Sequence, residues 1–303
     1  MKLALEGVYK SFGEKEVLKG LSFAVEAGNA MGLLGRNGAG KTTAIRIIMD
    51  IFKADGGGVT LDGEPIHKRK LKLGYLPEER GLYAKLKVSD QILFFAQLKG
   101  MSKDEAVKRQ AELLKRLEAE EYRNSRLETL SKGNQQKIQL LIAVINDPDI
   151  LILDEPFTGL DPVNATLLKD LIIELTAKNK VVMFSSHQMP YVEEFCRHIC
   201  IINDGRAALD GNIKDIRRTY PRNRIHVSYD EKALPGPLPF SRDDLPYVSD
   251  IARKNGELTF TLKDENDRNR LMGFIAEKMS ADSFAVVEPS LEEIFVDYAG
   301  GQV

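Results

Sequence analysis

A glycine-rich segment, Gly35 to Thr43, has the composition and spacing of a phosphate-binding loop. It fits the pattern G-x-x-x-x-G-K-S/T, in which glycines let successive backbone N–H groups point at one phosphate. An apolar run typical of a buried strand, residues 30–34, precedes the loop, and residues 44–49 follow it with helical periodicity. In this strand–loop–helix order the loop holds phosphate at a helix N-terminus, which disfavours an ordinary glycine-rich turn.

The side chains of this loop indicate a nucleoside triphosphate as the ligand. Lys41 would reach the β- and γ-phosphates, and the Thr42 hydroxyl would hold Mg²⁺. We predict phosphate contacts from the whole loop, namely from Gly35, Asn37, Gly38, Ala39, Gly40, Lys41, Thr42 and Thr43.

Two carboxylates and a histidine follow two further apolar strands. Asp154 and Glu155 come directly after the apolar run 150–153, which suits the centre of a parallel sheet, and His187 follows the apolar run 181–184. Ligands of open α/β sheets bind at the carboxyl ends of the strands. We therefore expect Asp154 to hold Mg²⁺ beside the phosphate loop and His187 to contact the γ-phosphate.

The periodicity of the first 220 residues indicates the elements that position these groups. Residues 2–34 alternate as strands and hairpins, residues 55–58 read as a turn, and a long middle stretch is almost wholly helical. We predict an α/β P-loop core over residues 1–220, into which a helical subdomain at about 86–146 is inserted.

Residues 221–303 follow a different pattern, with a boundary at Pro221. Alternating strands, one of them at 258–262, are combined with helices, the last of which begins after Ser290. These features predict a small C-terminal α+β domain. None of the motifs described above lies in this domain. We therefore expect the domain to be dispensable for nucleotide binding and to serve regulation or dimer stability.

The composition is that of a globular protein. Of 303 residues, 43% are hydrophobic and 29% are charged, and the net charge is −2, so no chain-wide basic field favours nucleic acid or an acidic membrane. No apolar run approaches the ~18 residues of a membrane span. The opening segment, Met1 to Glu6, lacks the apolar region of a signal peptide. We expect any membrane role to act through a partner.

The two cysteines flank a histidine. Cys196, His198 and Cys200 would supply three metal ligands with no obvious fourth, and Cys200 lies within an apolar strand-like run. We therefore interpret the cysteines as buried thiols of a reducing compartment rather than as a metal site.

Taken together, these motifs resemble those of the ATP-binding subunit of ATP-binding cassette (ABC) transporters. Residues 35–43 match Walker A, and residues 150–154 match Walker B, with Glu155 at the catalytic glutamate. Residues 130–135 match the family signature, and residues 159–161 match the D-loop. The resemblance covers residues 1–220 and implies a P-loop NTPase fold of the ABC ATPase type.

Three further positions are interpreted through the resemblance. His187 falls at the switch histidine of the family, and Phe12 falls at the aromatic residue that stacks on adenine, although spacing alone fits a core residue equally well. Glu78 stands where the family has the Q-loop glutamine, and an acid there adds negative charge near phosphate.

The signature reads LSKGNQ rather than LSGGQ, so Lys132 replaces a glycine. Ser131 and Gly133 remain, and the family uses these two on the γ-phosphate bound by the partner subunit. The sequences of residues 77–83 and of a tail at 291–295 resemble those of a bacterial exporter subgroup, in which the permease is a separate ABC-2-type chain. Some members of this subgroup are linked to sodium or drug efflux.

The resemblance implies an ATPase that drives transport. Two copies would sandwich two ATP molecules, with Mg²⁺ held by Thr42 and Asp154, and Glu155 would deprotonate the attacking water. Closure of the dimer would drive a separate permease, with the chain at the cytoplasmic face of the membrane. The loop from Glu78 to Leu86 and the helix after Ser89 would contact the permease.

Leu82 and Tyr83 would form the anchor of that contact, or they would fold back over the core. A soluble ABC ATPase acting on ribosomes or DNA is the alternative function, but it would usually carry two cassettes or a basic or zinc insertion. A small-molecule P-loop kinase would leave the signature and His187 unexplained.

Overall fold

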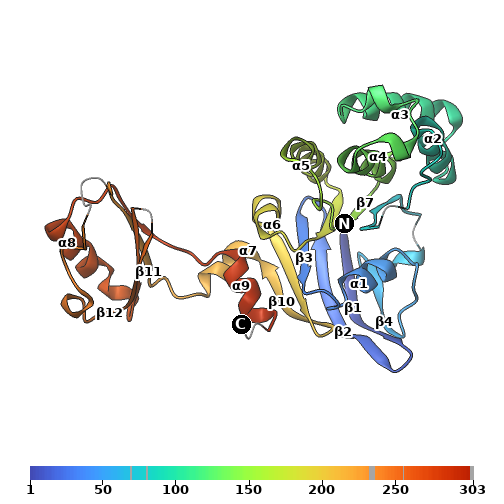
Figure 1. Cartoon of the computed structure of the whole chain (residues 1–303). Helices are drawn as coiled ribbons and strands as arrows, with labels where there is room; N and C mark the ends of the chain where they lie inside the picture. Colours follow the sequence, from blue (N-terminus) through green and yellow to red (C-terminus); the bar gives the residue numbers. More distant parts are fainter. Residues whose placement is uncertain (69, 80, 232–235, 255, 301–303) are drawn as a thin grey trace. The chain divides into compact units, whose positions relative to one another are not determined.

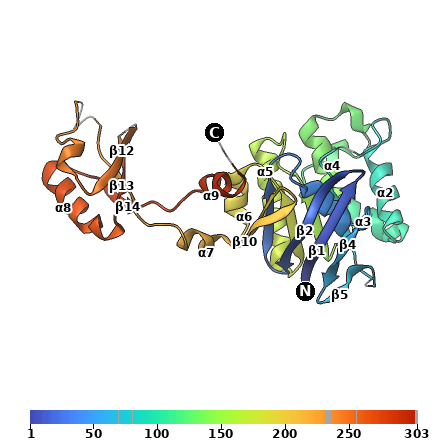
Figure 2. The ribbon, with the colours of Figure 1, turned by 90° about the horizontal axis from the view of Figure 1, so that it is seen from below.

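The structure is a computed structural model and describes residues 1–68, 70–79, 81–231, 236–254 and 256–300. The chain separates into two compact units. The first comprises Met1–Ile213 and the segment from Leu291 onward, and the second is Lys214–Ser290. Both are drawn in Figure 1 and, from below, in Figure 2. This division differs from the domain expected at 221–303, because the last helix packs with the first unit.

A six-stranded sheet forms the centre of the first unit, in the order β10-β9-β3-β8-β7-β6. Five strands are parallel, and β10 pairs antiparallel with β9. The bounds are Ala30–Gly35 (β3), Leu73–Leu76 (β6), Ile150–Asp154 (β7), Val181–Ser185 (β8), His198–Asn203 (β9) and Arg206–Asn212 (β10). β3, β7 and β8 are buried along their whole length, which explains their unbroken apolar runs and confirms the predicted parallel sheet.

A second, antiparallel sheet covers the first helix and shares its core with the central sheet. Its strands, in the order β2-β1-β4-β5, are Lys2–Phe12 (β1), Lys15–Glu26 (β2), Gly56–Leu61 (β4) and Glu64–Pro65 (β5). The turn predicted at 55–58 is wrong, because Gly56–Leu61 is a strand. Gly57 has φ +69°, and a Cβ there would lie 2.2 Å from the Gly7 carbonyl oxygen, so only glycine permits this pairing.

Helices α1 (Lys41–Ile48), α5 (Pro162–Ala177) and α6 (Met189–Phe195) each follow a strand of the central sheet. The predicted helical subdomain contains α2 (Val88–Leu98), α3 (Lys103–Arg116) and α4 (Lys132–Val144), with 3-10 turns at Glu120–Tyr122 and Leu127–Thr129. Figure 1 shows these three helices grouped together. α4 is almost wholly buried, because it packs on α2 and α3 and on β6 of the central sheet.

The described residues of the second unit form a four-stranded antiparallel sheet on which a helix packs. The strands, in the order β12-β13-β11-β14, are Arg224–Ser228 (β11), Val248–Lys254 (β12), Glu257–Leu262 (β13) and Ser283–Val286 (β14). Leu271 and Ile275 of α8 (Arg268–Lys278) pack on the buried face of the sheet. This architecture is the predicted α+β type.

The remaining helices are α7 (Ile213–Arg218) and α9 (Leu291–Tyr298), with 3-10 turns at Ile66–Lys68, Arg242–Asp244 and Glu265–Asp267. Among the described residues, none of the helices combines the length and apolar character that crossing a bilayer requires.

Candidate active site

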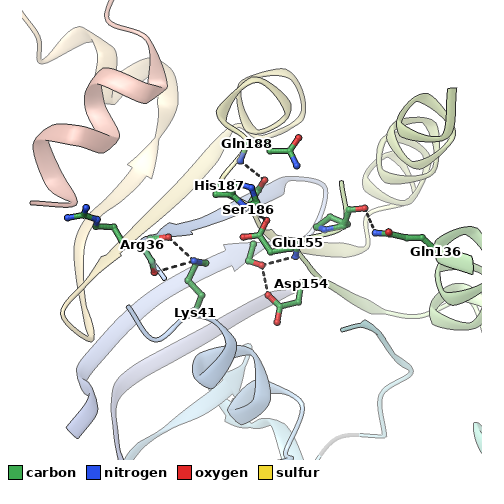
Figure 3. Close-up of polar contacts among 11 residues, drawn as sticks. Arg36, Lys41, Gln136, Asp154, Glu155, Ser186, His187 and Gln188 are labelled. Carbon is green, nitrogen blue, oxygen red and sulfur yellow. Dashed lines mark hydrogen bonds and ion pairs between the residues drawn. The ribbon is translucent and has the colours of Figure 1, made fainter. Parts of the chain in front are cut away.

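The phosphate loop connects β3 to α1. Gly40 is the N-cap of α1 and has φ +111°, and a Cβ there would lie 2.6 Å from Leu18 Cδ2, so a larger residue would displace the loop. Lys41 is buried and donates through Nζ to the carbonyl oxygens of Gly35 (2.7 Å) and Arg36 (3.4 Å), as Figure 3 shows. The loop thus carries its ammonium group pre-positioned at a helix N-terminus.

A cleft of about 890 Å³ opens over this loop, within the ~300–1,000 Å³ range of small-molecule sites. Most of the predicted site residues line it: Gly35, Asn37, Gly38, Gly40, Lys41, Thr42, Thr43, Glu78, Asp154, Glu155 and His187. Residues from four separate strand ends and loops therefore converge on one site, as the parallel sheet requires.

Asp154 and Glu155 are tied together by the hydroxyl of Ser185, at the end of the neighbouring strand β8. Ser185 Oγ donates to Asp154 Oδ1 (2.5 Å) and accepts from the Glu155 backbone N–H (3.0 Å). Ser185 is fully buried, and Asp154 is 1% exposed. This pairing fixes the backbone of Glu155, whose φ of +49° is unusual for a residue with a side chain.

The carboxylate of Glu155 is held by His187. Glu155 Oε2 lies 2.8 Å from His187 Nδ1 and 3.4 Å from the His187 backbone nitrogen. Because a carboxylate accepts, Nδ1 carries the hydrogen in this contact, and Nε2 remains on the side of the ring away from Glu155. Figure 3 shows both side chains beside Asp154.

The donor set fits a magnesium ion. Asp154 Oδ2 is buried and has no hydrogen-bond partner within the described part of the chain. A buried carboxylate oxygen without a partner is costly, and hard oxygen donors such as this one and the Thr42 hydroxyl are those that Mg²⁺ prefers. Thr42 and Asp154 both line the cleft.

Ser185→Ala should destabilise the first unit and slow turnover. The change leaves Asp154 Oδ1 and the Glu155 N–H buried without this partner, which should cost about 1–3 kcal/mol in the free energy of unfolding. Denaturant unfolding and ATP turnover measure the two effects. Ser89→Ala is the matched control, because its hydroxyl bonds Asp90 at the surface; equal effects of both variants would contradict the bridging role.

Four predicted site residues do not line the cleft. Phe12 is exposed and packs edge-to-face on Phe52, so the surface interpretation is favoured over the core one. Ala39 is buried in the core beneath the loop. Ser131 is the N-cap of α4, where its Oγ accepts from Asn134 N–H, and Gly133 lies close to Asn164.

The signature helix is linked to the Walker B strand within the chain. Gln136 Nε2 of α4 donates to the carbonyl of Pro156 (2.6 Å), directly after Glu155, as Figure 3 shows. Sequence reasoning missed this contact, and it also missed Ser185 and Phe295, which lines the cleft. The sequence feature that could have identified Ser185 is a lone hydroxyl at the end of an apolar strand. No sequence feature pointed to Phe295.

Both cysteines are buried thiols. Burial raises the pKa of Cys196 and of Cys200 well above the usual range, and the charge of Asp210 adds to the effect at Cys200. His198 Nε2 lies 2.7 Å from Asp210 Oδ1 rather than beside the thiols as a ligand. Where residues are described, no cluster of histidine, cysteine and acidic groups suits a metal.

Comparisons with known proteins find relatives over both parts of the chain. The family described as ABC transporter matches residues 18–158, and the family described as ATP-binding protein DrrA1-3-like, C-terminal domain, matches residues 211–299. The ABC transporter ATP-binding protein YhaQ of Bacillus subtilis is 38% identical over 98% of both chains. The linearmycin resistance ATP-binding protein LnrL of the same organism is 30% identical over 98% of both chains.

The Nod factor export ATP-binding protein I of Paraburkholderia xenovorans is 34% identical over 85% of this chain and 84% of its own. Among solved structures, an ATP-binding subunit of an ABC transporter superposes with a TM-score of 0.67 at 29% identity, covering 72% of this chain and 93% of that chain. A dimeric post-hydrolysis state of the cassette MJ0796, bound to ADP and Pi, has a TM-score of 0.63 at 25% identity, covering 70% and 98%. This chain is a member of the ABC transporter ATP-binding protein family, an ATP-binding and ATP-hydrolysing transporter subunit.

Proposed function

We propose that this chain energises an ABC-2-type exporter, as a homodimer that acts on a separate permease. The convergence of Lys41, Asp154, Glu155 and His187 on one cleft carries the proposal, because these groups supply what phosphoryl transfer to water needs. Relatives named for linearmycin resistance and Nod factor export support the direction of transport.

Each residue has a distinct task. The phosphate loop and Lys41 bind the phosphates of ATP, and Thr42 and Asp154 would hold Mg²⁺, which supplies charge neutralisation of the phosphate oxygens when bound. Glu155 accepts the proton of the attacking water. His187 orients the Glu155 carboxylate through Nδ1, and its ring would contact the γ-phosphate.

The signature residues explain why two copies are needed. Ser131 and Gly133 do not line the cleft of their own chain, so they contact nucleotide only across an interface with a second copy. The dimeric cassette MJ0796 supports this arrangement. Phe12 would stack on the adenine, and Glu78, which lines the cleft, would lie near the phosphates.

An exposed apolar surface on α2 and the loop before it fits a permease contact. Its members are Tyr83 (54% exposed), Leu86, Phe94 and Leu98 (71% exposed). Tyr83 stacks on Phe95, which in turn contacts Phe94 edge-to-face, so the aromatic rings form one cluster. Clustered exposed aromatic and aliphatic side chains are typical of protein–protein interfaces. This surface favours the anchor interpretation of Tyr83 over folding back on the core.

The loop that presents Tyr83 is held in place. The side chain of Gln91, buried in α2, accepts from Tyr83 N–H (2.9 Å) and donates to the Leu86 carbonyl (3.2 Å). The same loop follows Glu78, which lines the cleft. A movement at the cleft would be passed to the α2 surface through the loop that begins after Glu78.

Tyr83→Asp should abolish coupling to the permease while ATP binding stays unchanged, because it places a charge in the proposed interface outside the cleft. Co-purification with its permease, and transport by the pair, are the measurements. Ile173→Asp on α5, an equally exposed apolar site, is the control. Retained binding and transport in the Tyr83 variant would contradict this interface.

The alternative of a ribosome- or DNA-associated ATPase is less well supported, because the full-length relatives are transporter subunits. With the permease as its partner, the chain would lie at the cytoplasmic face of the membrane.

A further inference from the structure

The C-terminal helix α9 is built into the first unit. Leu291 and Ile294 are fully buried. The Leu291 N–H donates to Glu193 Oε1 of α6 (2.5 Å), and Asn203 Nδ2, at the end of β9, donates to the Tyr298 carbonyl (3.2 Å). The helix is therefore bonded to α6 at its first residue and to the end of β9 at its last, although it follows the whole accessory unit in sequence.

A chain of hydrogen bonds runs from this segment to the phosphate-binding lysine. Arg36, in the phosphate loop, donates through Nη1 to the Gly300 carbonyl (3.3 Å), and the Arg36 carbonyl accepts from Lys41 Nζ (3.4 Å). Figure 3 shows the Arg36 side chain directed toward α9 and its carbonyl toward Lys41. The backbone carbonyl of the C-terminal segment thus holds a residue of the loop that binds phosphate.

Phe295 gives this helix a direct place in the site. Among the cleft-lining residues it is one of three with apolar side chains, with Val17 of β2 and Met189 of α6. Leu291 and Ile294 face the core, Val296 is 43% exposed, and Phe295 is partly buried between them. The ring forms a wall of the cleft instead of completing the core.

We propose that Phe295 is a nucleotide-contacting residue and that α9 completes the ATP site from the C-terminal end of the chain. The proposal rests on the proposed function, since it names a further residue of the same site. An aromatic ring on a cleft wall removes water from one side of the bound nucleotide and adds apolar contact area. Residues 214–290 and the segment from Leu291 onward therefore have different roles, and only the latter contributes to nucleotide binding.

Fluorescence tests the contact directly, because the chain contains no tryptophan. Phe295→Trp in the full chain introduces a single indole on the cleft wall, and saturating MgADP should change the intensity or wavelength of its emission. Val296→Trp, one residue away on the exposed side of α9, is the control and should not respond. Unchanged emission from the Phe295 variant, while calorimetry shows MgADP bound, would overturn the proposal.

A binding measurement gives the energetic effect. Phe295→Ala should raise the Kd for MgADP by about tenfold, as expected for loss of a large aromatic contact, whereas Val296→Ala should leave it unchanged. Thermal unfolding without nucleotide separates lost contact from lost folding, because the proposal predicts weaker binding at nearly unchanged stability. Equal Kd values for both variants would contradict it.

Lys41→Ala distinguishes failure of the proposed role of α9 from failure of the proposed nucleotide site. If that variant loses affinity while Phe295→Ala does not, the site assignment stands and only the role of α9 fails. If Lys41→Ala binds MgADP as tightly as the wild type, the proposed nucleotide site itself is wrong.

Discussion

Glu155→Gln should bind MgATP with nearly unchanged affinity and hydrolyse it at least ~100-fold more slowly, which is the range expected for loss of a general base. The amide can still accept a hydrogen bond from His187 Nδ1, so the geometry at 2.8 Å is retained while the ability to take a proton is lost. Because the phosphate loop is untouched, the variant should accumulate as an ATP-bound dimer. Phosphate release and size exclusion with and without MgATP measure both effects.

Glu120→Gln is the matched control for this substitution. Glu120 is an exposed carboxylate of the helical subdomain and does not line the cleft, so turnover and dimerisation should remain at the wild-type level. If Glu155→Gln turned over ATP nearly as fast as the control, Glu155 could not be the general base.

Lys41→Ala should weaken ATP binding by roughly 10- to 100-fold, because charge-assisted hydrogen bonds to phosphate are worth about 1.5–3 kcal/mol. The ammonium group is already buried against the carbonyl oxygens of Gly35 and Arg36, so binding requires little reorganisation of the lysine. Calorimetric titration with MgATP in the Glu155→Gln background, where hydrolysis is slow, gives the affinity directly.

Two controls accompany the lysine variant. Lys115→Ala removes an exposed ammonium group from α3 and should leave affinity unchanged. Thermal unfolding without nucleotide reports the cost of freeing the two loop carbonyls. An affinity equal to that of the Lys115 variant would show that the glycine-rich segment is not the phosphate site.

The sequence by itself predicted the phosphate loop, the buried parallel strands and the acidic strand end. These features are local: nine consecutive residues define the loop, and an unbroken apolar run defines β7 as a strand buried on both faces. Once the strands are known to be parallel, Asp154 and His187 must lie at one edge of the sheet, so their meeting with Lys41 followed from pattern and topology together. The capping box that Ser102 and Glu105 form at the start of α3 is equally local.

Only the tertiary structure decided which distant residues complete the site. Ser185 bonds both the Asp154 carboxylate and the Glu155 backbone N–H because β8 pairs with β7, and position 57 must be glycine because a Cβ there would lie 2.2 Å from the Gly7 carbonyl oxygen. The sequence indicated a final helix after Ser290 but not the surface on which it packs, so we had assigned that helix to the domain at 221–303. Periodicity indicates that a face is buried but not which distant segment covers it, so the place of Phe295 in the cleft emerged only from the folded chain.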